Sequence, residues 1–154
     1  PRTKAVLANP IGRGKLRQVA TRFGESVLYL KSLDRKIRVL NRSKGTVVAE
    51  AADVADTSEK RRRGLLKHTH LGPGEGLWIA PCEAVHSFGM KFGIDLVYLD
   101  RKRKVKKVRH NMVPGRLSAC LTAHSVLELP AGVVAASRTE PGDQLEFETS
   151  GETG

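Results

Sequence analysis

A chain of 154 residues, of which 40% are hydrophobic and 28% charged, has the length and composition of one soluble globular domain. No apolar run approaches the roughly 18 residues that a membrane-spanning helix needs, so the sequence contains no candidate for such a helix. The formal net charge of +11 favours phosphates, anionic lipids or acidic proteins as partners, but it carries no information about the fold.

The first part of the chain is basic and has no regular hydrophobic period. Residues 1–36 contain nine Lys or Arg residues against only two acids, Glu25 and Asp34. We expect residues 1–36 to form a partly flexible basic extension, with one short strand over residues 27–30. The extension lacks the apolar core of a secretory signal, which favours a cytoplasmic protein.

A hairpin is expected where the extension ends. Residues 37–40 and 46–49 are apolar runs, and the stretch between them is rich in turn-forming residues. This arrangement is typical of two strands joined by a tight connection.

The segment after the hairpin has the pattern of a short helix. Asp56 and Glu59 have the spacing of a capping box, and residues 60–67 continue from them. Gly64 lies inside this helix, where glycine costs up to about 1 kcal/mol relative to alanine. We therefore expect a strand to pass close to the helix at Gly64, so that the missing side chain is used.

Short strands account for most of the remaining chain. They are expected over residues 77–79, 94–99, 105–108, 125–129 and 144–149. The pattern predicts a β-dominated α+β domain, which is a compact sheet or partly closed barrel of short strands with one or two short helices. Its expected range is residues 37–149, and residues 150–154 form a tail.

Six short motifs occur in a characteristic order along this domain. They are Arg63-Gly64-Leu65-Leu66, Gly74-Glu75-Gly76-Leu77, His86-Ser87-Phe88-Gly89-Met90-Lys91, Ile94-Asp95-Leu96-Val97-Tyr98-Leu99-Asp100, Leu127-Glu128-Leu129-Pro130-Ala131-Gly132 and Pro141-Gly142-Asp143. In this order and spacing the chain resembles the prokaryotic family known as domain of unknown function 192. The resemblance implies a small β-rich domain with a helix that carries the Arg-Gly-Leu segment, and it implies no established activity.

The chain departs from the common family pattern at two places. Many members have Trp just before the Met-Lys pair, where this chain has Gly89. The turn after Asp100 commonly holds a Gly and an acid, whereas here it is Arg101-Lys102-Arg103. The first change removes an aromatic wall from any pocket, and the second makes the tip of a hairpin strongly cationic.

Polar side chains gather in the loop that leads into the strand over residues 94–99. The candidate binding residues are Arg63, His86, Ser87, Met90, Lys91, Asp95 and Arg116. Lys91 and Asp95 would seat a small polar ligand, and Arg63 or Arg116 would hold an anionic group. The alternative is a structural role, in which Met90 fills the core and Lys91 pairs with Asp95.

Clusters of basic residues favour a second class of function. Arg61 and Arg62 lie beside Arg63, and Arg101, Lys102 and Arg103 begin a segment with seven cations among nine residues. Such clusters bind phosphates in a salt-dependent and sequence-independent way. No aromatic stacking residues surround them, so a solvated cationic face is the alternative interpretation.

The two cysteines, Cys82 and Cys120, form no C-x-x-C pair and are expected to be buried and free, with one disulfide as the alternative. Cys82 and His86 have the spacing of a nucleophile and its base, or of two metal ligands, but no further signature completes either site. We therefore predict no catalytic residue, no metal and no cofactor.

The sequence favours a non-catalytic domain for a small polar or anionic ligand. The alternatives are an electrostatic binder of nucleic acid or an anionic surface, with weak nonspecific nucleic-acid binding, and an enzyme that uses Cys82 or a carboxylate.

Overall fold

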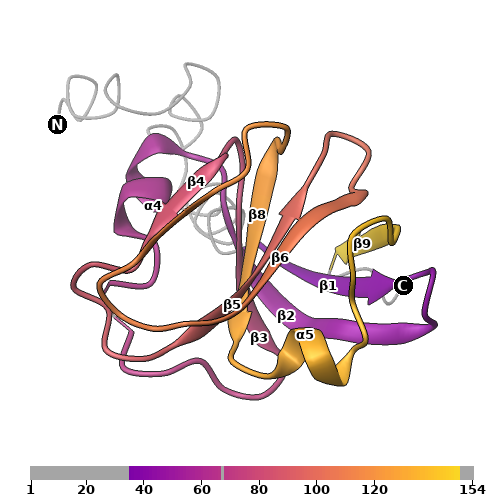
Figure 1. Cartoon of the computed structure of the whole chain (residues 1–154), viewed down its shortest axis with the longest axis horizontal. Coiled ribbons are helices and arrows are strands. Elements are labelled where there is room, and N and C mark those ends of the chain that lie inside the picture. Colours follow the sequence, from indigo (N-terminus) through magenta and orange to yellow (C-terminus); the bar gives the residue numbers. More distant parts are fainter. Residues whose placement is uncertain (1–34, 67, 150–154) are drawn as a thin grey trace, which may run out of the picture. The chain divides into compact units, whose positions relative to one another are not determined.

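The computed structural model describes residues 35–66 and 68–149, so the expectations for residues 1–34 of the extension and for the tail lie outside these ranges. The main sheet has seven strands: β1 (Lys36–Asn41), β2 (Thr46–Ala55), β3 (Glu75–Ile79), β5 (Ile94–Leu99), β6 (Val105–Met112), β8 (Ser125–Pro130) and β9 (Leu145–Thr149) (Figure 1). A small sheet pairs β4 (Ala84–His86) with β7 (Leu117–Ala119). Two short helices, α4 (Ser58–Arg63) and α5 (Val133–Ala136), complete the described elements.

The main sheet curls so that its two edges approach one another. Its order is β6-β5-β8-β3-β2-β1-β9, and β2 with β3 is the one parallel pair among the strands described. The edge strands meet at one end, where Val105 donates to the carbonyl of Asp143 at 2.8 Å and Leu145 donates to that of Arg103 at 3.0 Å. The expected partly closed barrel of short strands is therefore confirmed.

Both faces of the central strands are buried, because the sheet separates two hydrophobic clusters. Val97 and Leu99 of β5 point into the first cluster, which we call the barrel core. Leu96 and Tyr98 alternate with them and point into the second cluster, which we call the helix-side core because Leu65, two residues after α4, belongs to it. This alternation follows from the period of two in a strand. It also places every second residue of β8 on the helix side.

The helix differs from the sequence-based expectation at both ends. Thr57, not Asp56, is the N-cap, because its hydroxyl accepts a hydrogen bond from the Lys60 amide at 3.2 Å. The helix ends at Arg63, and Gly64 is its C-cap with φ +46°. The expected close strand at Gly64 is wrong: a Cβ there would meet only the Arg61 carbonyl oxygen, at 3.8 Å. Glycine is needed at position 64 because the backbone has a positive φ there, and residues other than glycine rarely adopt this conformation.

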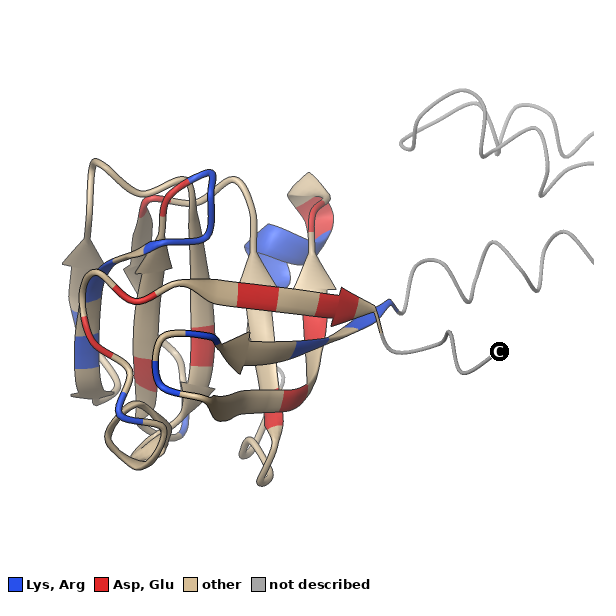
Figure 2. Ribbon diagram, turned by 90° about the vertical axis from the view of Figure 1, so that its right-hand side faces the viewer, with Lys and Arg blue, Asp and Glu red and all other residues tan. Residues whose placement is uncertain are grey.

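Charged side chains on the outer strands pair with one another. Arg38 of β1 donates to Glu50 of β2 at 2.9 Å and to Glu148 of β9 at 3.4 Å. At the opposite edge, Lys107 and Arg109 of β6 donate to backbone carbonyls around β7 at 2.8 and 2.6 Å. Figure 2 shows both kinds of charge along the outer strands, whereas basic residues dominate α4.

Candidate functional site

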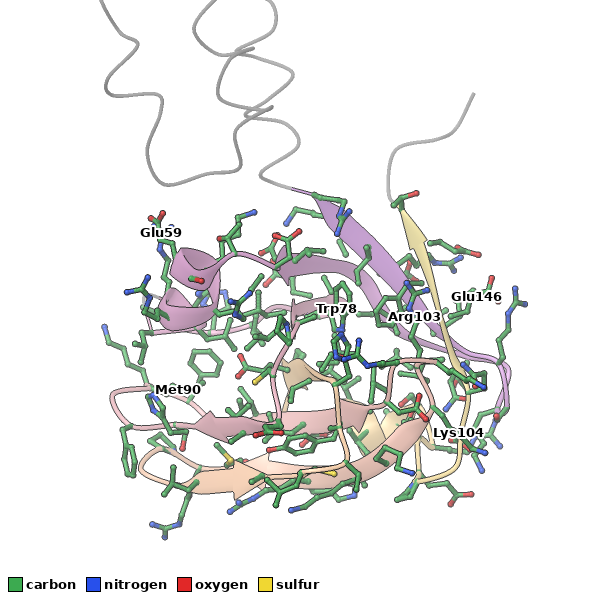
Figure 3. The ribbon with its side chains drawn as sticks, turned by 90° about the horizontal axis from the view of Figure 1, so that it is seen from above. Glu59, Trp78, Met90, Arg103, Lys104 and Glu146 are labelled. Carbon is green, nitrogen blue, oxygen red and sulfur yellow. The ribbon has the colours of Figure 1, made fainter. Side chains whose placement is uncertain are left out.

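A cavity of about 640 Å³ opens between α4, the end of β3, β4 and β8. Its apolar wall comes from the helix-side core and includes Leu65, Ile79, Val85 and Met90. The ionisable residues that line it are Arg61, Arg62, Arg63, Cys82, His86 and Glu128. Figure 3 shows Glu59 on the outward side of α4 and Met90 on the opposite side of that helix. The cavity has the volume and the mixed lining typical of small-molecule sites.

The arginines reach the cavity because α4 is short and well fixed. Arg61 is half-buried and donates to the carbonyls of Asp56 and Ala80, at 2.9 and 3.3 Å. These bonds tie the helix to the end of β3. Arg62 and Arg63 are exposed at the rim, where Arg63 pairs with Glu59 at 3.1 Å. The rim is therefore cationic, and its guanidinium groups retain donors for an anion.

Glu128 brings a carboxylate into the apolar side of the cavity. It lies on β8 directly between Leu77 of β3 and Leu96 of β5, and its side chain alternates with those of Leu127 and Leu129, which belong to the barrel core. Only 3% of the residue is exposed. Within the described residues Oε2 is the one buried carboxylate oxygen that lacks a hydrogen-bond partner.

Burial in these surroundings raises the pKa of Glu128 from 4.5 to about 7. The physical cause is desolvation, because neighbouring leucines cannot solvate the ionised form. A carboxyl group with a pKa near neutrality exchanges its proton readily under physiological conditions. Glu128 is therefore the one carboxylic acid among the described lining residues, and burial brings its pKa close to neutrality.

Cys82 and His86 both line the cavity, but the thiol is not prepared for nucleophilic attack. Cys82 is half-buried and donates to the Ala84 carbonyl at 3.1 Å. Burial raises the pKa of its thiol, whereas a nucleophilic cysteine requires a lowered one. His86 is exposed and stacks on Phe88, with 5.6 Å between the ring centroids. Cys120, like Cys82, is a free thiol and partly buried.

Two of the residues expected to bind a ligand hold the backbone together. The Asp95 carboxylate is fully buried and accepts hydrogen bonds from the amides of Asn111 at 2.8 Å, Gly132 at 3.0 Å and Val134 at 2.9 Å. The buried Ser87 hydroxyl donates to the Val113 carbonyl at 2.7 Å and accepts from the Arg116 amide at 2.9 Å. Neither side chain lines the cavity.

The other candidates divide between the cavity and the remaining surface. The structure brings Arg63, His86 and Met90 together with Arg61 and Arg62 around the cavity. Lys91 and Arg116 are exposed outside the set of lining residues, and Asp95 has backbone partners rather than Lys91.

The cationic hairpin lies apart from the cavity lining. Arg101 and Lys102 are exposed at its tip. Arg103 adopts φ +64° and covers the ring of Phe147 at 4.3 Å, and that ring packs edge-on against Trp78 at 5.0 Å. Figure 3 shows Trp78 and Arg103 within this group. One of the three tip cations is therefore committed to a contact inside the domain.

Sequence reasoning did not single out Glu128 as a site residue. The sequence does contain a relevant pattern, because Glu128 is the one acid in an apolar strand, Val126-Leu127-Glu128-Leu129, that is bounded by turns. A strand of this kind is buried on both faces when it lies in the centre of a sheet, so its acid must also be buried. The sequence does not show that this strand is central, whereas the structure places β8 between β3 and β5 in the middle of the sheet.

The described residues contain neither a metal-binding cluster nor a helix that could span a membrane. No group of three or more His, Cys, Asp or Glu side chains within residues 35–66 and 68–149 is placed to hold a metal ion. In the same part of the chain, no helix has both the length and the apolar character that crossing a membrane requires.

Comparison with known proteins identifies the family. Residues 39–147 match the family DUF192, described as "Uncharacterized ACR, COG1430", and the chain belongs to it. A UPF0127 protein from Thermococcus sibiricus is 30% identical over 120 residues, which cover 74% of this chain and 77% of the relative. Another from Thermococcus gammatolerans is 26% identical over 117 residues, with 73% and 76% coverage.

Solved structures support the same fold. A protein from Sinorhizobium meliloti 1021, provisionally named a transcription regulator, superposes with a TM-score of 0.65 at 21% identity, covering 74% of this chain and 93% of that one. A protein of unknown function from Novosphingobium aromaticivorans gives a TM-score of 0.63 at 24% identity, with 72% and 83% coverage. At these identities the likeness concerns the fold alone, and the function of the family is not known.

Proposed function

We propose that this domain binds a small polar or anionic ligand in the cavity beside α4 and performs no chemistry on it. The observation that carries the proposal is the cavity of about 640 Å³, which joins an apolar wall to a rim of guanidinium groups. Small-molecule sites combine a concave apolar surface with a few converging polar groups in this way. Arg62 and Arg63 are the anion-binding residues of the proposal.

The nucleic-acid alternative has weaker support from the described residues. The basic side chains are distributed over separate elements, and Lys107, Arg109 and Arg103 already make contacts within the domain. Three of the cations that could contact phosphates therefore already have partners within the domain.

The enzyme alternative has one specific observation in its favour, which is the raised pKa of Glu128. A general base also needs a substrate atom within hydrogen-bond reach and a partner that stabilises the charge that develops. Turnover of a ligand bound in the cavity, lost on Glu128→Gln while binding persists, would favour the enzyme over the binding domain.

A thermal-shift screen with a library of metabolites and metal salts tests the proposal. A ligand that binds only the folded state stabilises it by about 2.7 kcal/mol at a concentration of 100 times its Kd. The paired change Arg62→Ser and Arg63→Ser should reduce the shift caused by a true ligand. Arg101→Ser with Lys102→Ser removes the same charge from the distant hairpin and serves as the matched control. Equal responses of both variants to every stabilising compound would contradict the proposed site.

A further inference from the structure

An acid lies in the interior of the cavity and guanidinium groups lie at its rim, and the two do not pair with one another. Glu128 Oε2 has no hydrogen-bond partner, and the causes that shift the pKa of Glu128 include burial but no nearby cation. Arg61 is held instead by the carbonyls of Asp56 and Ala80. Glu128 and the guanidinium groups therefore line one cavity without pairing with one another, and burial favours the protonated form of Glu128 because an unpaired buried carboxylate is costly.

We propose, on the basis of the binding function above, that the ligand is amphoteric, with a protonated nitrogen that pairs with Glu128 and an anionic group that binds Arg62 and Arg63. The ligand class is that of an amino acid or a similar amine that also carries a carboxylate or phosphate. Its middle part lies against the apolar wall formed by Leu65, Ile79 and Met90.

The surroundings of Glu128 explain why it needs a cationic group from outside the protein. Its neighbours in the sheet are Leu77 and Leu96, and neither can donate a hydrogen bond. Cys82 interacts electrostatically with Glu128 but donates its thiol to the Ala84 carbonyl, so a ligand in the cavity is the donor that the site can add. A nitrogen cation is favoured over a neutral hydroxyl because a hydrogen bond between two charged groups is stronger in surroundings that exclude water.

The proposal can be tested with simple ω-amino acids that place the two charges at different separations. We would measure the affinity of the full chain for 4-aminobutanoate, 6-aminohexanoate and 8-aminooctanoate by calorimetry. Hexylamine and hexanoate each lack one charge and are the matched single-charge probes. The best ω-amino acid should bind about tenfold or more tightly than either single-charge probe, which is the effect of one hydrogen bond to a charged group.

Variants separate the two ends of the ligand. Glu128→Gln keeps the shape of the side chain and should remove the advantage of the amino group. Glu83→Gln removes an exposed charge outside the lining and is its control. The pair Arg62→Gln and Arg63→Gln should weaken the ω-amino acid and hexanoate but leave hexylamine unchanged. Equal affinity of hexanoate and the best ω-amino acid would overturn the inference, as would unchanged affinity in Glu128→Gln.

The pH dependence gives an independent readout. The ionisable groups that line the cavity are Arg61, Arg62 and Arg63 from α4, Cys82 from the loop before β4, His86 from β4 and Glu128 from β8. Because Glu128 must be ionised to bind an amine, affinity should rise as pH increases through about 7 and then level off. Glu128→Gln should abolish this rise, and His86→Gln should preserve it. A fall in affinity over the same range would show a protonated Glu128 donating to the ligand, which contradicts a cationic group at that position.

The results distinguish this inference from the broader proposal. If none of the ω-amino acids binds, the amphoteric class is wrong. The binding function still stands if the library screen yields a compound whose effect depends on Arg62 and Arg63.

Discussion

Two buried carboxylates lie on neighbouring strands of the same sheet, and their surroundings differ completely. Asp95 at the start of β5 accepts three backbone amide hydrogen bonds, two of them from the residues around the start of α5. Glu128 on β8 has leucines beside it, and its Oε2 has no partner. The first carboxylate is an internal part of the fold, whereas the second faces a cavity and lacks the group that would satisfy it. Burial alone therefore does not distinguish a structural acid from a binding acid.

The largest effect should come from removing the satisfied carboxylate. Asp95→Ala leaves the amides of Asn111, Gly132 and Val134 without their acceptor, and each such loss costs about 1–3 kcal/mol. We expect the free energy of unfolding in urea to fall by about 4 kcal/mol in total. Asp95→Asn retains one oxygen and should lose less. Similar stability of Asp95→Ala and the natural protein would remove the contrast between the two acids.

Removing the unsatisfied carboxylate of Glu128 should instead raise the free energy of unfolding above neutral pH. The folded state favours protonated Glu128, because its pKa is about 7 in the folded chain against 4.5 without burial. The contribution of Glu128 to the free energy of unfolding is therefore fully present below pH 4.5. It falls as pH rises toward about 7 and is lost above that value. The free energy of unfolding should differ by about 3 kcal/mol between pH values below 4.5 and pH values above about 7.

Urea unfolding measured as a function of pH tests this linkage. Glu128→Gln should lose this component of the pH dependence, while the control Glu83→Gln should retain it. Identical pH profiles for the natural protein and Glu128→Gln would show that Glu128 is solvated or paired in solution.

A smaller effect is expected at the helix that builds the cavity rim. Gly64→Ala forces a side chain into the conformation at φ +46° and ψ −134°, which should cost about 1–3 kcal/mol. Thermal unfolding should show a lower Tm, and ligands of the cavity should bind more weakly because the rim arginines are displaced. Gly45→Ala, at φ +67° in the hairpin between β1 and β2, provides a strained control far from the cavity lining. A higher Tm for Gly64→Ala would refute the conformational role of Gly64.

The smallest effect should follow from changes in the cationic hairpin. Arg101 and Lys102 are exposed at its tip, and exposed charges contribute little to stability. Replacing both by Ser should shift Tm by less than about 2 °C. Any weak binding to nucleic acid should decrease and lose part of its salt dependence, since fewer phosphate contacts remain. Retention of the same salt dependence would place nucleic-acid binding elsewhere on the molecule.

The sequence predicts the strands better than it predicts the site. The apolar run of β5 and the turn-bounded segments around it determine the main strands, because burial and the period of two act locally. β4 and β7, each three residues long, have too little sequence for a periodic pattern to form. A glycine near the end of a helical pattern can be an interior residue or a C-cap with positive φ, and the sequence pattern around Gly64 does not separate the two.

The site depends on tertiary contacts that no local pattern contains. Asp95 was a binding candidate because it lies beside other polar residues in the sequence, yet its partners come from residues 16 to 39 positions away. Glu128 has no polar neighbour in the sequence that would mark it as a site residue, because it is a single acid within an apolar strand. Whether a carboxylate has partners is decided by elements that meet only after folding.

The meeting of β6 and β9 has a consequence for the behaviour of the chain in concentrated solution. An open sheet presents backbone amides and carbonyls at both edges, and these attract strands from other molecules. In this domain, hydrogen bonds between residues 103–105 and 142–145 occupy part of both edges. Lys107 and Arg109 further cover the β6 edge by reaching toward β7. The curl of the sheet thus protects the folded chain against edge-to-edge aggregation, at the same time as it shapes the interior.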